Sequence, residues 1–165
     1  MKSKYKILTD PDNHKLNNNA GEYYYVEDLI AQTPDGLIRV RGKYAATKIK
    51  FIGGIWIIDN DHSIEQKPDI VNGSSIPWFG QWLISKEGKW NRSSGFHDKG
   101  YKYAKIEFFV NGRWIYYKKS RKWFDQLYRS LMESRGVEEW NSTTQYEMLR
   151  SCGWWTWWNY RRHDE

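Results

Sequence analysis

The sequence predicts an α+β fold, with a small N-terminal antiparallel sheet followed by about three helices and a β-hairpin inserted between the first two. Short runs rich in β-branched and aromatic residues, cut by Gly and Pro, lie between residues 22 and 58 and are typical of antiparallel strands. An Asn-Gly pair and then an apolar stripe at helical spacing mark the second half. Because 165 residues suffice for one core and no linker or repeat is visible, we expect a single domain. Its halves are a mainly β part, 1–70, and a helical part, 71–165.

The first half reads as strands separated by turns. We expect strands at 22–30, at 37–41 after the turn 33–36, and at 47–51 and 55–58 around a Gly-Gly pair. Polar residues with turn chemistry precede them. Nothing in this half indicates a functional site.

The second half has clearer local signals. A helix is expected over 95–103, and strands 105–110 and 113–118 are joined by Asn111-Gly112, which suits a type I′ hairpin turn. A helix over 120–135 follows and is stopped by Gly136; its apolar stripe comprises Phe124, Leu127, Tyr128, Leu131 and Met132. A last helix is expected over 141–152, ending at Gly153.

The net charge and the aromatic content favour some classes of binding partner over others. The formal net charge of +6 suits nucleic acid, anionic lipid or an acidic protein. The 11 Trp and 12 Tyr fill a core or a subunit interface, or else form an interfacial belt or stacking platforms for bases. No apolar run approaches the roughly 20 residues that span a bilayer, and no apolar signal region follows the basic N-terminus. A lone Cys152 excludes an intramolecular disulfide and a Cys-rich zinc site.

One constellation has the residue types for catalysis. His97 and Tyr101 are four residues apart on the expected helix, so they stack on one face while Asp98 points about 100° away. If the next helix packs antiparallel, Asp125 lies beside the His97 ring. A carboxylate on one ring nitrogen fixes the tautomer and frees the other nitrogen to deprotonate water. Asp98 would remain for a hard cation such as calcium, together with loop carbonyl oxygens. The alternative is a structural hydrogen-bond network.

Basic and aromatic residues interleave between 113 and 123. A nucleic-acid surface would pair phosphate contacts with base stacking here, and the candidate binding residues are Arg113, Lys118, Lys119 and Arg121. The alternative is a hairpin strand with one solvated face, followed by a helix N-terminus.

From about Val71 onward the chain resembles a phage-encoded family of unknown function. Four motifs carry the resemblance, in the same order: Gly73-Ser74-Ser75-Ile76-Pro77, His97-Asp98-Lys99-Gly100-Tyr101, Arg121-Lys122-Trp123-Phe124-Asp125 and Tyr146-Glu147-Met148-Leu149-Arg150-Ser151-Cys152-Gly153. The family commonly has Asp just before the first Gly, where this chain has Asn72. The resemblance therefore makes Asn72 a candidate metal ligand beside Asp98, and a weaker one than a carboxylate.

The order His97-Asp98, hairpin, Asp125 is also similar to that of phospholipases of the secreted A-two type. That resemblance implies His97 as the base, Asp98 as a calcium ligand, and Tyr101 and Asp125 as the groups that orient the histidine. The glycine-rich calcium loop of those enzymes has no counterpart here unless residues 72–76 replace it.

Three functions follow as hypotheses. The first, implied by the phage resemblance, is a virion- or tail-associated structural or assembly protein. It would be made in the host cytoplasm and would bind other phage structural proteins or itself, with the His-Asp-Tyr-Asp cluster as a structural or vestigial site. The second is a calcium-assisted hydrolase at an anionic lipid surface. The third is a nucleic-acid-binding accessory protein.

Overall fold

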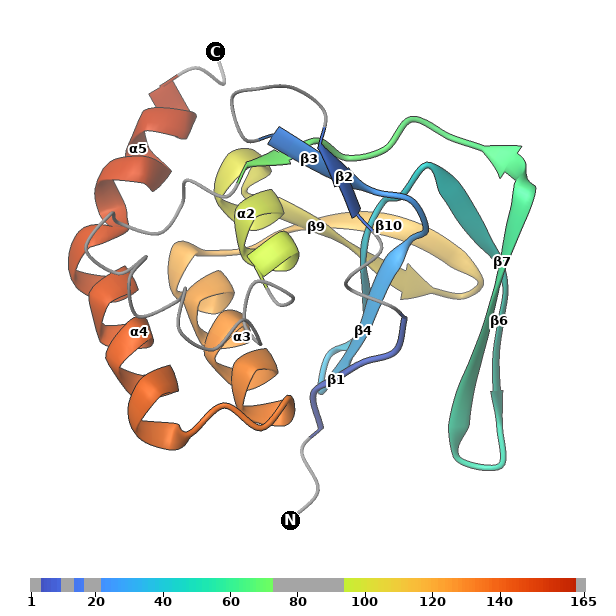
Figure 1. Ribbon diagram of the computed structural model, residues 1–165, viewed down its shortest axis with the longest axis horizontal. Helices are drawn as coiled ribbons and strands as arrows, with labels where there is room; N and C mark the ends of the chain where they lie inside the picture. Colours follow the sequence, from blue (N-terminus) through green and yellow to red (C-terminus); the bar gives the residue numbers. More distant parts are fainter. Residues whose placement is uncertain (1–3, 10–13, 17–21, 73–93, 163–165) are drawn as a thin grey trace.

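The computed structural model describes residues 4–9, 14–16, 22–72 and 94–162 (Figure 1). Antiparallel strands precede a set of helices, which confirms the predicted α+β class. The strands are β1 (Lys6–Ile7), β2 (His14–Leu16), β3 (Glu22–Tyr25), β4 (Leu29–Thr33), β5 (Gly36–Val40), β6 (Tyr44–Ile52), β7 (Ile55–Glu65), β8 (Val71–Asn72), β9 (Lys105–Val110) and β10 (Arg113–Lys118). The helices are α2 (Ser94–Tyr103), α3 (Arg121–Ser134), α4 (Glu139–Cys152) and α5 (Trp154–Arg162).

The main sheet is built from both halves of the chain. Its order is β1-β4-β5-β9-β10, and its neighbouring strands are antiparallel. The inserted hairpin thus joins the N-terminal strands, because β9 pairs with β5 and places Arg39 opposite Glu107. Two smaller sheets, β2-β3-β8 and β6-β7, flank it.

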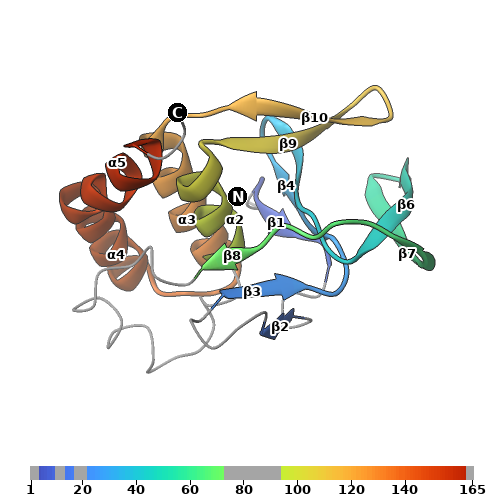
Figure 2. The same cartoon turned by 90° about the horizontal axis from the view of Figure 1, so that it is seen from above.

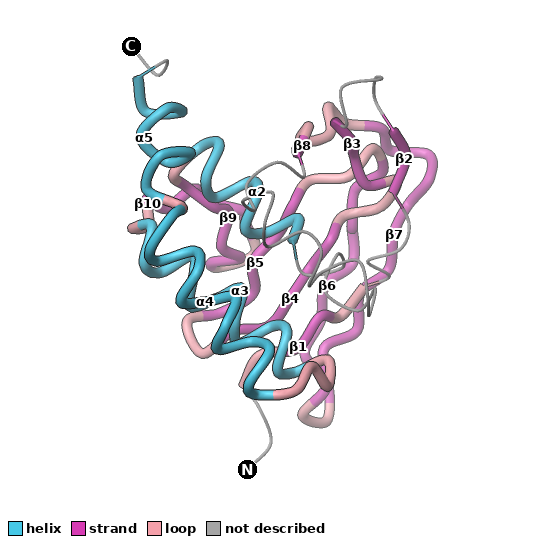
Figure 3. Tube along the Cα trace, turned by 60° about the vertical axis from the view of Figure 1, so that its left-hand side comes forward, coloured by secondary structure: helices cyan, strands magenta, loops and turns pink. Residues whose placement is uncertain are grey.

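Apolar side chains cover both faces of the main sheet. On one face Ile38, Ile106 and Phe108 pack with Phe124 and Leu127 of α3. On the other face Ile30 and Leu37 pack with residues of the long β6–β7 hairpin, among them Ile49, Trp56 and Ile58. The helices and this hairpin therefore lie on opposite sides of the sheet (Figures 1 and 3).

The local signals of the second half are confirmed. Asn111 (φ 51°) and Gly112 (φ 79°) form the hairpin turn with the two positive φ angles of type I′. Ser120 caps α3 by accepting a hydrogen bond from the Trp123 amide at 3.1 Å. Gly136 (φ 87°) follows the end of α3.

One expected strand boundary was wrong, and one helix was not expected. The strand predicted over 22–30 is broken between β3 and β4, because Asp28 turns inward and binds backbone amides of a later loop. The helix expected over 141–152 does end at Cys152, but α5 follows at once, so the described residues form four helices where about three were expected. Gly153 has right-handed angles (φ −69°, ψ −16°) and does not act as a left-handed stop. Among the described residues no helix is long and apolar enough to cross a bilayer.

Helix α2 packs closely against helix α3 on one side and against strand β3 on another. A Cβ atom at Gly100 would lie 2.1 Å from the Phe124 ring, and one at Gly95 would lie 2.4 Å from the Tyr25 hydroxyl. Glycine at these positions lets α2 approach both neighbours closely. Strand β8 lies beside α2 as well (Figure 2). The close approach gives α2 two buried faces, one toward α3 and one toward the sheet.

Candidate functional site

One buried carboxylate, that of Asp125, connects three helices. It lies on α3 and is fully buried. Its Oδ1 atom is 2.9 Å from His97 Nε2 and accepts a hydrogen bond from the Tyr101 hydroxyl at 2.6 Å, both from α2. Its Oδ2 atom accepts a hydrogen bond from Arg150 of α4 at 3.0 Å, with the Arg121 guanidinium 3.6 Å away. The predicted meeting of His97, Tyr101 and Asp125 is therefore confirmed.

Helical spacing explains this geometry. The rings of His97 and Tyr101 lie one turn apart on α2, with centroids 4.2 Å from each other. Tyr128 lies almost one turn after Asp125 on α3, and its ring centroid is 5.1 Å from that of His97. The imidazole is thus packed between two phenol rings and fixed at one nitrogen by the carboxylate.

The contacts of Asp125 also determine its protonation. Burial alone would raise the pKa of this carboxyl group, but the hydrogen bonds from His97, Tyr101 and Arg150 lower it below its ordinary value. Burial, and then the charge of Asp125, raise the pKa of Tyr101, so this phenol stays a hydrogen-bond donor. Asp125 is therefore an ionised acceptor at neutral pH, and the hydrogen-bond pattern assigns a proton to Nε2 of His97.

The other imidazole nitrogen has no such partner. Nδ1 of His97 is buried and has no hydrogen-bond partner among the described residues, and the residue as a whole is only 1% exposed. A buried polar atom without a partner is uncommon and marks a place where a water molecule or a ligand group would be bound. The dyad therefore fixes the ring through Nε2 and leaves Nδ1 without a partner in the described part of the chain.

The two candidate metal ligands, Asp98 and Asn72, lie on elements that both contact strand β3. Asp98 is 2% exposed and accepts a hydrogen bond from the Tyr23 hydroxyl of β3 at 3.0 Å. Asn72 lies in β8, which pairs with β3, and its backbone lies opposite Glu22. In the described ranges no three His, Cys, Asp or Glu residues are grouped so that they could hold a metal ion. Calcium prefers six to eight oxygen ligands, so these donors alone do not fit it. The segment 73–77 lies outside the described residues, and calcium binding stays a prediction.

The candidate binding residues of the basic segment do not share one environment. Arg113 and Lys118 are exposed on β10, while the Lys119 ammonium lies over the rings of Phe108 and Trp123. Arg121 turns toward α4 and donates to the Leu149 carbonyl at 2.8 Å. Its guanidinium thus caps the end of a helix, and nucleic-acid binding by this segment stays a prediction.

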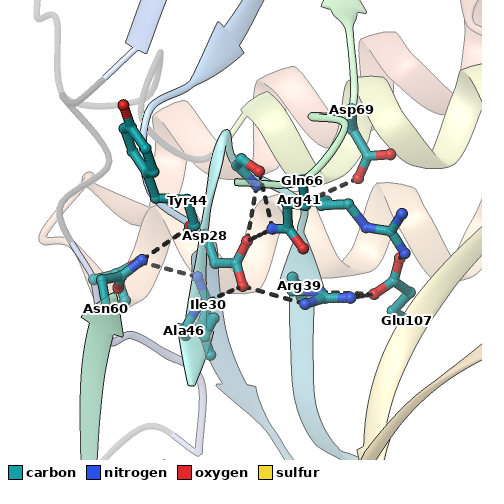
Figure 4. Close-up of polar contacts among 12 residues, drawn as sticks. Asp28, Ile30, Arg39, Arg41, Tyr44, Ala46, Asn60, Gln66, Asp69 and Glu107 are labelled. Carbon is teal, nitrogen blue, oxygen red and sulfur yellow. Dashed lines mark hydrogen bonds and ion pairs between the residues drawn. The ribbon is translucent and has the colours of Figure 1, made fainter. Parts of the chain in front are cut away.

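A second buried polar cluster was not predicted from the sequence (Figure 4). Arg39 binds Asp28 at 3.2 Å and Glu107 through two of its nitrogens, and Arg41 donates to Glu107 at 3.0 Å. Lys99 is fully buried, with its Nζ atom 2.5 Å from Asp69. The sequence did contain a signal for this cluster. A charged residue interrupts each of two apolar strand runs, Arg39 in 37–41 and Glu107 in 105–110.

The three motifs of the helical half converge on Asp125. The first supplies His97 and Tyr101, the second Arg121 and Asp125 itself, and the third supplies Arg150. Gly153, also of the third motif, is needed because a Cβ atom there would lie 2.6 Å from the Tyr101 hydroxyl.

Residues 66–148, a little more than half of the chain, match the family model described as Protein of unknown function (DUF1353). The chain belongs to this family. The DUF1353 match contains His97, Tyr101 and Asp125, and ends just before Arg150. Comparison with curated proteins and with solved structures found no match.

Proposed function

We propose that this DUF1353 protein is a hydrolase in which His97 removes a proton from water that attacks an ester. The observation that carries the proposal is the His97–Asp125 hydrogen bond of 2.9 Å, combined with the buried Nδ1 atom of the same ring, for which the described ranges offer no partner. A general base needs a fixed tautomer and a free lone pair, and this arrangement provides both.

The roles of the residues follow from the contacts. Asp125 keeps the proton on Nε2 and stabilises the imidazolium that forms when Nδ1 takes a proton from water. Tyr101 and Arg150 hold the carboxylate in place and keep it ionised. The hydroxide equivalent adds to the ester carbonyl, and His97 then returns its proton to the departing alcohol oxygen. Because Nδ1 is buried, the reacting water must be enclosed with the substrate, which excludes bulk solvent.

The resemblance to phospholipases of the secreted A-two type suggests a phospholipid ester as substrate. We expect the wild-type protein to hydrolyse a liposomal phospholipid, and we expect His97→Gln to lower the rate by about 10²–10⁴-fold, the usual contribution of a general base. Glutamine retains a side-chain donor for Asp125 and lacks a basic nitrogen. Fatty-acid release is measured with calcium and with a chelator, which also tests the calcium hypothesis.

A matched control is His62→Gln, because His62 is exposed on β7 and bonds Glu27 at 2.6 Å, away from the dyad. Its rate should equal that of the wild type. Circular dichroism and a thermal melt verify that both variants are folded. Background rates for the wild type, equal to those of folded His97→Gln, would overturn the proposal.

A second candidate is an assembly component of a phage virion or tail, and an exposed apolar surface favours it. We define the hairpin tip as Phe51, Ile52, Ile55 and Ile57, which are 60%, 56%, 67% and 45% exposed. Apolar side chains gathered in this way mark contact surfaces. If the protein has this function, the hydrogen bonds of Asp125 serve only to hold α2, α3 and α4 together.

The assembly function predicts self-association or co-purification with virions through the hairpin tip. We expect the double variant Phe51→Ser/Ile55→Ser to be monomeric in sedimentation analysis and to be lost from purified particles. The matched control Lys48→Ser/Lys50→Ser changes charged neighbours on the same hairpin and should leave assembly intact. A monomeric wild-type protein that is absent from virions would contradict this candidate.

A further inference from the structure

A small cavity lies on the sheet-facing side of α2, next to the second polar cluster. Its volume is about 220 Å³. Pockets that take drug-sized ligands are roughly 300–1,000 Å³, so this cavity suits one small group. The residues that line it come from the segments after β5 and β7, the end of α2, and strands β9 and β10: Arg41, Lys67, Pro68, Asp69, Tyr103, Lys105 and Tyr116.

The charges around the cavity are unbalanced toward positive. Three cations and one carboxylate line it. The carboxylate, Asp69, is already engaged, because its Oδ2 atom accepts from the Arg41 amide at 2.7 Å and lies 2.5 Å from the buried Lys99 ammonium. Neither Lys67 nor Lys105 has an ion-pair partner among the described residues. Lys99 therefore neutralises Asp69 and Glu107 pairs with Arg41, so the charges of Lys67 and Lys105 are the ones left uncompensated at the cavity.

Hydrogen-bond donors are also available at this place. The Arg41 guanidinium donates to Glu107 at 3.0 Å through one terminal nitrogen, but its Nε atom is buried and has no partner among the described residues (Figure 4). Leaving a buried donor of a charged group unused is costly. The Tyr116 hydroxyl, in contrast, is already bound to Glu107; burial, and then this hydrogen bond, raise the pKa of Tyr116.

We infer that this cavity binds a phosphate group through Arg41, Lys67 and Lys105. A guanidinium and two ammonium groups around a small space match the charge and the several acceptor oxygens of a phosphate dianion better than the single charge of a carboxylate. The site is distinct from the His97–Asp125 dyad, which lies on the other face of α2. It does not depend on the proposed hydrolase activity.

Binding of inorganic phosphate to the whole protein tests this inference. Amide chemical shifts are followed during the titration, and we expect those of residues 41, 67, 69, 105 and 116 to move together. The double variant Lys67→Ala/Lys105→Ala should weaken phosphate binding by at least about tenfold. Both side chains are exposed and the Arg41–Glu107 pair is retained, so this variant keeps the fold.

The matched control is Lys48→Ala/Lys50→Ala, which removes the same charge from the exposed hairpin. It should bind phosphate as the wild type does. Equal weakening in both double variants, or equal affinity for acetate and phosphate, would overturn the inference, as would the absence of binding at millimolar phosphate. A parallel titration with glycerol 3-phosphate distinguishes a free phosphate from an esterified one: tighter binding of the ester supports a phosphate carried on a larger molecule.

Discussion

Asp125→Ala is expected to lower the free energy of unfolding by about 3–5 kcal/mol, the usual cost of removing one partner of a buried ion pair. The carboxylate accepts hydrogen bonds from α2 and α4 while lying on α3. Its removal leaves the Tyr101 hydroxyl and His97 Nε2 buried without an acceptor, and Arg150 without its counter-ion. Urea denaturation at neutral pH measures the change.

Asp59→Ala is the matched control, since Asp59 is exposed on β7. We expect it to change the free energy of unfolding by no more than about 0.5 kcal/mol, as surface substitutions usually do. An Asp125→Ala protein within 1 kcal/mol of the wild type would show that the cluster does not hold the helices together.

The same pair of proteins should differ less in acid. Because the folded protein lowers the pKa of Asp125 below the unfolded value of about 3.9, its charged form contributes stability that is fully present above that pH. The contribution is lost as the pH falls through the lower folded pKa. The difference in stability between wild type and Asp125→Ala should therefore be constant from neutral pH to about pH 5 and shrink below about pH 4. Denaturation curves across this range test the sign.

Local sequence signals predicted the parts of the fold that depend on neighbours in the chain. The Asn111-Gly112 turn, the end of α3 before Gly136 and the His97–Tyr101 stack each need information from a few residues only. The contact between His97 and Asp125 was also predictable, because two helices joined by a short hairpin pack side by side and present fixed faces. The sequence did not indicate that Arg150 completes the cluster, since α4 can pack on α3 in several registers.

The second polar cluster depends on contacts distant in sequence, which is why the sequence did not reveal it. Arg39 and Glu107 meet only because β9 pairs with β5 in one register, across 68 residues. Each residue alone is a charged position within a strand, and the sequence does not tell which strand lies beside it. The strand break at Asp28 has the same origin. The groups that donate hydrogen bonds to its carboxylate come from segments further along the chain, which neighbouring residues do not reveal. Buried charges at strand positions are therefore explained by register, not by propensity.

Asp28→Ala is expected to be about as damaging as Asp125→Ala, at roughly 3–5 kcal/mol, although no catalytic role is proposed for this residue. Asp28 is fully buried and its two oxygens accept four hydrogen bonds. The donors are the Gly42 amide (2.8 Å), the Gln66 amide group (2.6 Å), the Ala46 amide (3.0 Å) and Arg39 (3.2 Å). One carboxylate thus ties β4 and β5 to both ends of the β6–β7 hairpin.

Asp28→Ala should make the hairpin open locally, in addition to lowering the free energy of unfolding. Without Asp28 the Gly42 and Ala46 amides lose their acceptor, so hydrogen exchange at these two amides should become faster before the main sheet opens. The control Gln66→Ala removes one neutral donor and leaves the other three, so it should cost only about 1 kcal/mol. Exchange measured by NMR separates the two effects. If Gly42 and Ala46 keep their protection in Asp28→Ala, the hairpin is held by its apolar contacts with Ile30 and Leu37, and the carboxylate serves mainly to neutralise Arg39.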